Sequence, residues 1–111
     1  MDRTIPSSLR PALETYEARL RARFGSRVRE VRLFGSYARG EANERSDVDV
    51  LALIDGLSDT ERLQAVDEAT YLMLETGLAL SPLPMATEKL DELRRRERAL
   101  ARALDTEGIV L

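Results

Sequence analysis

Apolar residues recur along this chain with spacings that alternate between those of helices and those of strands. They first recur at every third or fourth position between residues 9 and 24, which predicts an amphipathic helix. Ser7 or Ser8 is expected to cap the start of this helix, and Gly25 is expected to end it. The residues that define its apolar face are Leu9, Leu13, Tyr16, Leu20 and Phe24.

Two short apolar runs follow the first helix, and each has the length of a strand. They cover residues 28–34 and 47–54. The second is apolar on both faces beyond Asp49, which predicts a central strand covered on both sides. A third run, residues 78–85, contains two prolines that cannot donate hydrogen bonds to a sheet, so this strand should pair on one side only. Residues 108–111 are expected to add a short edge strand.

Two further helices are predicted in the second half of the chain, which makes the fold class α/β. Ser58 and Glu61 form a capping-box pattern for a helix that Gly77 should end. Its expected buried residues are Leu63, Val66, Thr70 and Met73. Thr87 is expected to cap a single last helix. The apolar residues at helical spacing in that helix are Leu90, Leu93, Leu100 and Leu104.

Composition narrows the possible functions. The 111 residues suit one domain, residues 1–111, with 43% hydrophobic and 33% charged residues. The chain has no cysteine and no histidine, so thiol chemistry, histidine metal sites and Ser-His triads are excluded, and a metal would need oxygen ligands. A net charge of −3 argues against a general nucleic-acid binder. The sequence has no apolar run of membrane-spanning length and no signal-peptide pattern, so a cytoplasmic protein is expected.

The candidate chemistry lies in residues 33–53, between and within the first two predicted strands. Asp47 and Asp49 alternate with Val48, so both side chains should point to the same face, with Cα atoms roughly 6.5–7 Å apart. Two carboxylates that close repel one another unless a cation lies between them, and Mg²⁺ is typically held by one or two carboxylates plus phosphate oxygens. Taken alone, the pair is equally consistent with a metal site and with two solvated carboxylates at a strand edge.

A glycine–serine turn comes ten residues before this pair. Gly35 permits a close approach of the backbone to a ligand, and the amides after Ser36 can point at phosphate if a short helix starts near Tyr37. Arg39 follows one short turn later, where a guanidinium group can pair with phosphate. The alternative is that Ser36 is an ordinary turn residue and Arg39 an ordinary surface charge.

Gly35-Ser36, ten residues and Asp47-x-Asp49 together resemble the signature of the nucleotidyltransferase superfamily that includes DNA polymerase beta. The string GSYARGEANERSDVDV is similar to that of its small free-standing members, the minimal nucleotidyltransferase (MNT) domains. The resemblance implies a small mixed sheet flanked by helices. It also implies that Ser36 binds the phosphates of a nucleoside triphosphate, with ATP as the first candidate, and that Asp47 and Asp49 are catalytic ligands of Mg²⁺. Gly35 and Arg39 belong to the same predicted nucleotide site because of their places in the turn. Many MNT domains are similar to antitoxins encoded beside a HEPN-domain RNase toxin, which implies a HEPN-type toxin as the partner.

One expected residue of the family pattern is missing. Active members usually carry a third carboxylate on the strand after the Asp-x-Asp strand, and residues 78–85 contain neither Asp nor Glu. Ser81 stands about where the acid is expected, and the nearest acids, Glu75 and Glu88, lie outside the run. Two functions therefore stay open: a nucleotidyltransferase antitoxin that modifies its partner, or a catalytically degenerate antitoxin that neutralises its partner by contact.

A run of arginines near the C-terminus is a separate feature. Its members are Arg94, Arg95, Arg96, Arg98 and Arg102. Acidic residues interrupt the run, which favours a solvated helix face, while a contact with RNA or with a partner protein is the alternative.

Overall fold

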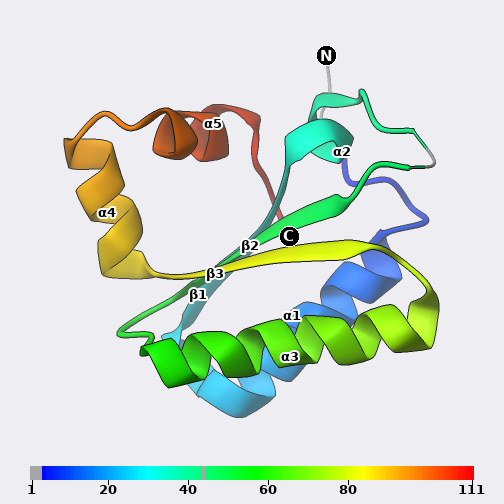
Figure 1. Cartoon of the computed structure of the whole chain (residues 1–111), viewed down its shortest axis with the longest axis horizontal. Helices are drawn as coiled ribbons and strands as arrows, with labels where there is room; N and C mark the ends of the chain where they lie inside the picture. The colour runs from blue at the N-terminus through cyan, green and yellow to red at the C-terminus, as the bar shows by residue number, and fades with distance from the viewer. Residues whose placement is uncertain (1–3, 44) are drawn as a thin grey trace.

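The computed structural model describes residues 4–43 and 45–111, which form a sheet with helices on both faces (Figure 1). The strands are β1 (Val28–Phe34), β2 (Val48–Ile54), β3 (Leu80–Ala86) and β4 (Ile109–Val110). They lie in the order β3-β2-β1-β4. β2 pairs with β3 in parallel, whereas β1 is antiparallel to both β2 and β4. The sheet is therefore mixed, and β2 is an interior strand, as its two apolar faces predict.

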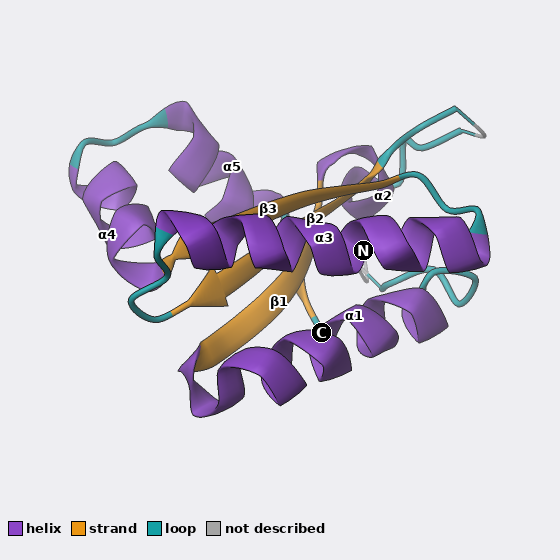
Figure 2. Cartoon of the chain, turned by 60° about the horizontal axis from the view of Figure 1, so that its bottom comes forward, coloured by secondary structure: helices purple, strands orange, loops and turns teal. Residues whose placement is uncertain are grey.

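The helices lie in two groups on opposite sides of the sheet. Helices α1 (Arg10–Phe24) and α3 (Asp59–Thr76) pack together below the sheet in Figure 1 and run in front of it in Figure 2. Helices α4 (Thr87–Arg95) and α5 (Ala99–Glu107) lie on the other side. A short helix, α2 (Gly35–Arg39), joins the end of β1 to the loop before β2, and a 3₁₀ turn (Gly25–Arg27) follows α1.

Alternation along β2 produces two separate hydrophobic cores. The even-numbered residues Val48, Val50, Ala52 and Ile54 face α1 and α3. Leu51 and Leu53 face the opposite side, where they pack with Leu90 of α4 and Leu104 of α5. Because side chains alternate along a strand, Asp49 belongs to the same face as Leu51, which is the α4–α5 face.

The first helix buries all five residues that its spacing selects, but its predicted cap is wrong. The N-cap residue is Leu9, and no side chain caps the helix. The carbonyl oxygen of Pro6 instead accepts hydrogen bonds from the amides of Leu9 (2.9 Å) and Arg10 (3.2 Å). Ser7 and Ser8 thus lie inside a backbone turn rather than in the extended conformation that an N-cap serine requires.

The capping box of α3 is confirmed, while its predicted buried face is wrong. Ser58 and Glu61 exchange both hydrogen bonds of the box, and Gly77 ends the helix in a left-handed conformation. The buried residues of α3 are Ala65, Ala69 and Leu72, whereas the predicted ones are Leu63, Val66, Thr70 and Met73. The alanines allow close packing on α1, where the Tyr16 hydroxyl donates to the Ala65 carbonyl at 2.9 Å.

The predicted last helix is two helices. The chain breaks between α4 and α5, where Glu97 has a φ of 51°, an uncommon value for a residue other than glycine. Thr87 is the first helical residue rather than the cap, since Ala86 precedes the helix without a side-chain hydrogen bond. Two remaining expectations are confirmed: among the described residues β3 pairs only with β2, and β4 is a short edge strand. Within the described residues, none of the helices is long and apolar enough to cross a membrane.

Candidate active site

The turn between β1 and α2 places backbone against a carboxylate. Phe34 is extended, and Gly35 adopts a φ of 73° as the first residue of α2, two residues earlier than predicted. Phe34 is paired with Asp49 across the antiparallel β1–β2 ladder. A Cβ added to Gly35 would collide with Oδ2 of Asp49 and lie 3.0 Å from its Cγ. Two independent reasons therefore favour glycine at position 35: its positive φ, and the lack of space for a Cβ beside the Asp49 carboxylate.

Asp47 and Ser81 both lie beside Asp49. Asp47 immediately precedes β2 and is exposed, while Asp49 is half-buried. Ser81 is the in-register partner of Asp49 across the parallel β2–β3 pair, where its hydroxyl group favours the ionised carboxylate. Burial, and then repulsion from Asp47, raise the pKa of Asp49, which the Ser81 hydroxyl group and the positive charge of Arg39 partly offset.

Arg39 lies close enough to act on Asp49, but its guanidinium group is already occupied. Nε donates to Glu41 at 3.0 Å, and one terminal nitrogen donates to Glu107 of α5 at 3.2 Å. These two carboxylates, Glu41 first, raise the pKa of Arg39. No sequence signal indicates Glu107, because it lies 68 residues from Arg39 and meets it only through the packing of α5 beside α2.

The glycine–serine turn also orients Ser36. Its carbonyl oxygen accepts hydrogen bonds from the amide of Gly40 and, at 2.9 Å, from that of Glu41. Gly40 closes α2 in a left-handed conformation with a φ of 75°. The turn thus holds the start of α2 beside Asp49, which is where the sequence predicts the phosphate contacts.

A third carboxylate is missing from the described part of this site. No group of three or more Asp or Glu residues suited to a metal occurs in residues 4–43 and 45–111. Glu75 pairs with Arg19 at 2.8 Å. Glu88 accepts a hydrogen bond from the Gly56 amide, which follows the opposite end of β2 from Asp49. The donor set is therefore two carboxylates, and it suits a hard cation whose other ligands come from phosphate and water.

We predict that Gly35→Ala lowers both the stability of the fold and the affinity for triphosphate. A left-handed φ costs a side-chain-bearing residue about 1–2 kcal/mol, and the added methyl group must also displace the Asp49 carboxylate. Gly25→Ala is the matched control, because Gly25 has a φ of 63° but a Cβ there meets nothing within 4 Å. Thermal unfolding and ATP titration of both variants separate backbone strain from carboxylate displacement. Equal effects in both assays would contradict a special role for the Gly35–Asp49 contact.

Comparison with known proteins agrees with this architecture. The family model described as a nucleotidyltransferase domain matches residues 13–102. A protein described as a putative protein adenylyltransferase, from Methanocaldococcus jannaschii, is 30% identical over 77 residues, which are 69% of this chain and 73% of that protein. The protein adenylyltransferase MntA of Thermococcus cleftensis is 44% identical over 66 residues, 60% of this chain and 63% of that protein.

Solved structures agree at the level of the fold. A crystal structure described as a toxin–antitoxin with AMP-PNP superposes with a TM-score of 0.57 at 22% identity, covering 87% of this chain and 70% of that chain. Three observations indicate the same family. They are the mixed sheet, the contact of the glycine–serine turn with Asp49, and the family match to residues 13–102. The chain therefore belongs to the nucleotidyltransferase domain family, as a member of the minimal nucleotidyltransferase type.

Proposed function

We propose that this protein binds a nucleoside triphosphate with Mg²⁺ and transfers a nucleoside monophosphate to a hydroxyl group of a partner protein. In this proposal it is the antitoxin of a toxin–antitoxin pair, and the partner is a HEPN-type toxin. The observation that carries the proposal is the contact between Gly35 and the Asp49 carboxylate. This contact places the Gly35-Ser36 turn, the proposed phosphate site, beside Asp49, a proposed ligand of Mg²⁺. The relatives described as protein adenylyltransferases support ATP as the nucleotide and a protein as the acceptor.

The carboxylates have one role in this proposal and the turn has another. Asp47 and Asp49 would hold Mg²⁺, which supplies positive charge to the phosphate oxygens when it is bound. Ser81, in register with Asp49 on the neighbouring strand, favours the ionised form of that carboxylate. The amides at the start of α2 and the Ser36 hydroxyl would bind the phosphates.

The reaction itself forms one bond and breaks one. The acceptor oxygen bonds to the α-phosphorus of the triphosphate, the bond from that phosphorus to the departing oxygen breaks, and pyrophosphate leaves. The acceptor's proton must pass to a base. Ser81 has the position next to Asp49 but not the basicity, because a hydroxyl group of ordinary acidity does not accept a proton at neutral pH.

The alternative function is an antitoxin that keeps the fold and neutralises its partner by contact alone. The observation that favours it is Ser81 in register with Asp49, since this leaves the described site with two carboxylates. The intact Gly35-Ser36 turn and the Asp47–Asp49 pair favour the enzyme. An Asp49→Ala variant that still neutralises the partner would support the contact-only function.

The deciding experiment uses the chain together with its co-expressed partner, labelled ATP and Mg²⁺. Label that becomes covalently attached to the partner, and that requires Asp49, would support transfer. ATP binding without attachment of label would support the contact-only antitoxin. Failure of ATP to bind under any of these conditions would contradict the proposed nucleotide site.

We predict that Arg39→Ala weakens triphosphate binding by roughly 1.5–3 kcal/mol, the scale of a hydrogen bond to a charged group. Glu41 and Glu107 now share this guanidinium group, so triphosphate must displace at least one of them to gain a bidentate contact. Arg62→Ala, on the exposed start of α3, is the control for loss of one positive charge. Calorimetric titration with ATP and with adenosine measures the effect. If the variant binds both ligands as the wild type does, Arg39 has no phosphate role.

A further inference from the structure

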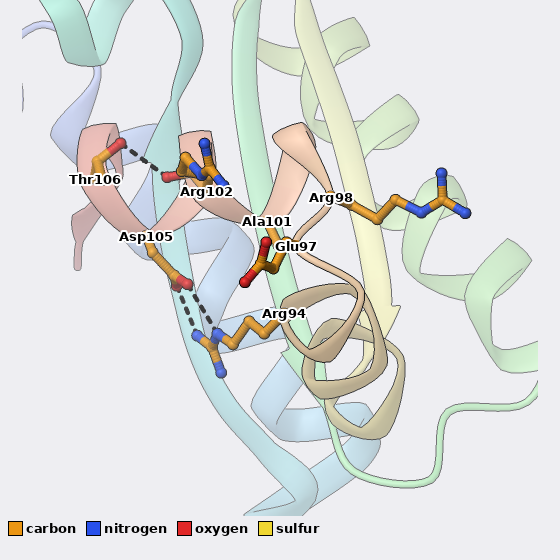
Figure 3. A pocket seen from close by; sticks show the side chains of 7 residues that line it. All are labelled: Arg94, Glu97, Arg98, Ala101, Arg102, Asp105 and Thr106. Carbon is orange, nitrogen blue, oxygen red and sulfur yellow. Dashed lines mark hydrogen bonds and ion pairs between the residues drawn. The ribbon is translucent and has the colours of Figure 1, made fainter.

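A groove runs between the end of α4 and the outer side of α5, on the face of the sheet that also carries Asp49. Its volume is about 260 Å³, and Ala101 lies among its lining residues. The charged side chains along it are Arg94, Glu97, Arg98, Arg102 and Asp105 (Figure 3). The break in the helix at Glu97 creates this groove, because a continuous helix would leave no angle between α4 and α5.

The charges in the groove are not equivalent. Asp105 is neutralised, since Arg94 binds it with two hydrogen bonds of 2.7 and 2.9 Å and the buried Arg32 donates to it at 3.3 Å. Arg98 and Arg102 are exposed, and neither side chain makes an ion pair with another residue of the described ranges. In Figure 3 these two side chains leave the backbone in different directions, away from the Arg94–Asp105 pair. The groove therefore offers two separate, unpaired cationic groups.

The groove extends along α5 toward the candidate active site. A second hollow of about 300 Å³ shares Glu97, Arg102 and Thr106 with the first and extends to Glu107. Glu107 is paired with Arg39 at 3.2 Å, so the second hollow ends at a residue that contacts the candidate site. At 1.5 Å per residue, Arg98 and Glu107 are roughly 13 Å apart along α5. A short segment of a partner protein could therefore extend from the two arginines to the candidate site.

We propose that the α4–α5 groove is the surface that docks an acidic segment of the partner protein, with Arg98 and Arg102 each binding one of its carboxylates. This inference rests on the proposed function, because it names the surface on which the acceptor protein is held. Two separated guanidinium groups suit two carboxylates spaced along a segment, and each can bind a carboxylate in bidentate geometry. A nucleic acid is disfavoured because its closely spaced phosphates are usually bound through many Lys and Arg contacts, whereas the free cations of this groove are two arginines.

The test measures binding of a fluorescein-labelled peptide of Glu-Ala-Ala-Ala repeats to the whole chain by fluorescence anisotropy, without nucleotide or Mg²⁺. The double variant R98A/R102A is expected to weaken binding by roughly tenfold, and added salt should weaken wild-type binding, because both contacts are exposed ion pairs. The control is R29A/R62A, which removes the same number of positive charges near the opposite end of the sheet, where Arg29 pairs with Asp55 at 2.7 Å. Glu97→Gln should tighten binding, because it removes the unneutralised carboxylate of the groove.

Each other outcome overturns the inference. Equal weakening by R29A/R62A would show attraction to overall charge rather than to the groove, and failure of the peptide to bind would exclude an acidic partner segment. A single-stranded RNA that binds more tightly than the peptide, through the same two arginines, would assign the groove to nucleic acid. Asp49→Asn separates this inference from the proposed function: it should bind the peptide like the wild type even if the protein transfers no nucleotide.

Discussion

Asp49→Asn is expected to abolish Mg²⁺-dependent triphosphate binding while leaving the fold intact. The amide keeps the shape of the carboxylate, and its oxygen can still accept hydrogen bonds, but it carries no charge for the cation. Removing one of only two carboxylates from the described site leaves Asp47 alone, which is a poor site for a hard divalent ion. The expected loss is therefore larger than that of any single phosphate contact.

The stability of this variant is a second readout with a defined sign. Burial and Asp47 raise the pKa of Asp49, so the folded protein holds that proton more tightly than the unfolded chain does. Ionised Asp49 therefore costs stability at pH values above its folded pKa, and the cost disappears as the pH falls through that pKa. Asparagine removes the cost at neutral pH, so the melting temperature of the metal-free variant should equal or exceed that of the wild type.

Calorimetric titration with ATP, in the presence and in the absence of Mg²⁺, measures the binding effect. Asp67→Asn, which removes one carboxylate from α3, controls for the change in net charge. An Asp49→Asn variant that keeps the full Mg²⁺ enhancement would remove Asp49 from the metal site. A variant that unfolds would instead show that the carboxylate is part of the fold, contrary to its raised pKa.

The features that the sequence predicts correctly depend on local chemistry. The sequence predicts β1 with the residues it has, and β2 one residue too long, because apolar runs bounded by turn residues specify strands directly. The Gly35 turn and the Ser58 capping box are predictable for the same reason, since each needs particular residues at fixed offsets.

Features that depend on contacts between distant segments are not predictable in this way. Large apolar residues suggest the wrong buried face for α3: Leu63 is 58% exposed, because the approach of α1 selects the small side chains of Ala65 and Ala69. The break at Glu97 has no clear signal either, since leucines at positions 93 and 100 fit one helix as well as two. The pairing of Arg39 with Glu107 follows from where α5 lies and also has no local signal.

Nucleotidyl transfer by the wild-type chain alone is expected to be very slow, and Ser81→Asp is expected to accelerate it. Loss of a base typically lowers a rate by about 10²–10⁴-fold, and Ser81 occupies the in-register position beside Asp49 from which a carboxylate would reach the same site. Because β2 and β3 are parallel and Ser81 faces Asp49, the substitution adds the acid without a change in backbone.

The added carboxylate also has a cost that makes the prediction specific. The new carboxylate would lie beside Asp49, whose pKa burial and Asp47 already raise, so three like charges would repel in the metal-free protein. The Ser81→Asp variant should therefore melt at a lower temperature than the wild type without Mg²⁺ and recover when Mg²⁺ is added. Ser81→Asn, which introduces nearly the same shape without the charge, should show neither the loss nor the recovery.

The test is the rate of transfer of labelled nucleotide, with and without the partner, for three proteins: the wild type, Ser81→Asp and Ser81→Asn. It shows whether the missing carboxylate on β3 limits that rate. Acceleration by the aspartate variant but not by the asparagine variant would show that the missing carboxylate limits the rate. Wild-type transfer that is slow alone and fast with the partner would fit a partner that supplies the acceptor hydroxyl, with or without the base. Fast transfer by the wild-type chain alone would contradict this account of β3, because a site with Ser81 at that position would then be fully active. The contact-only function would then be rejected in favour of the enzyme.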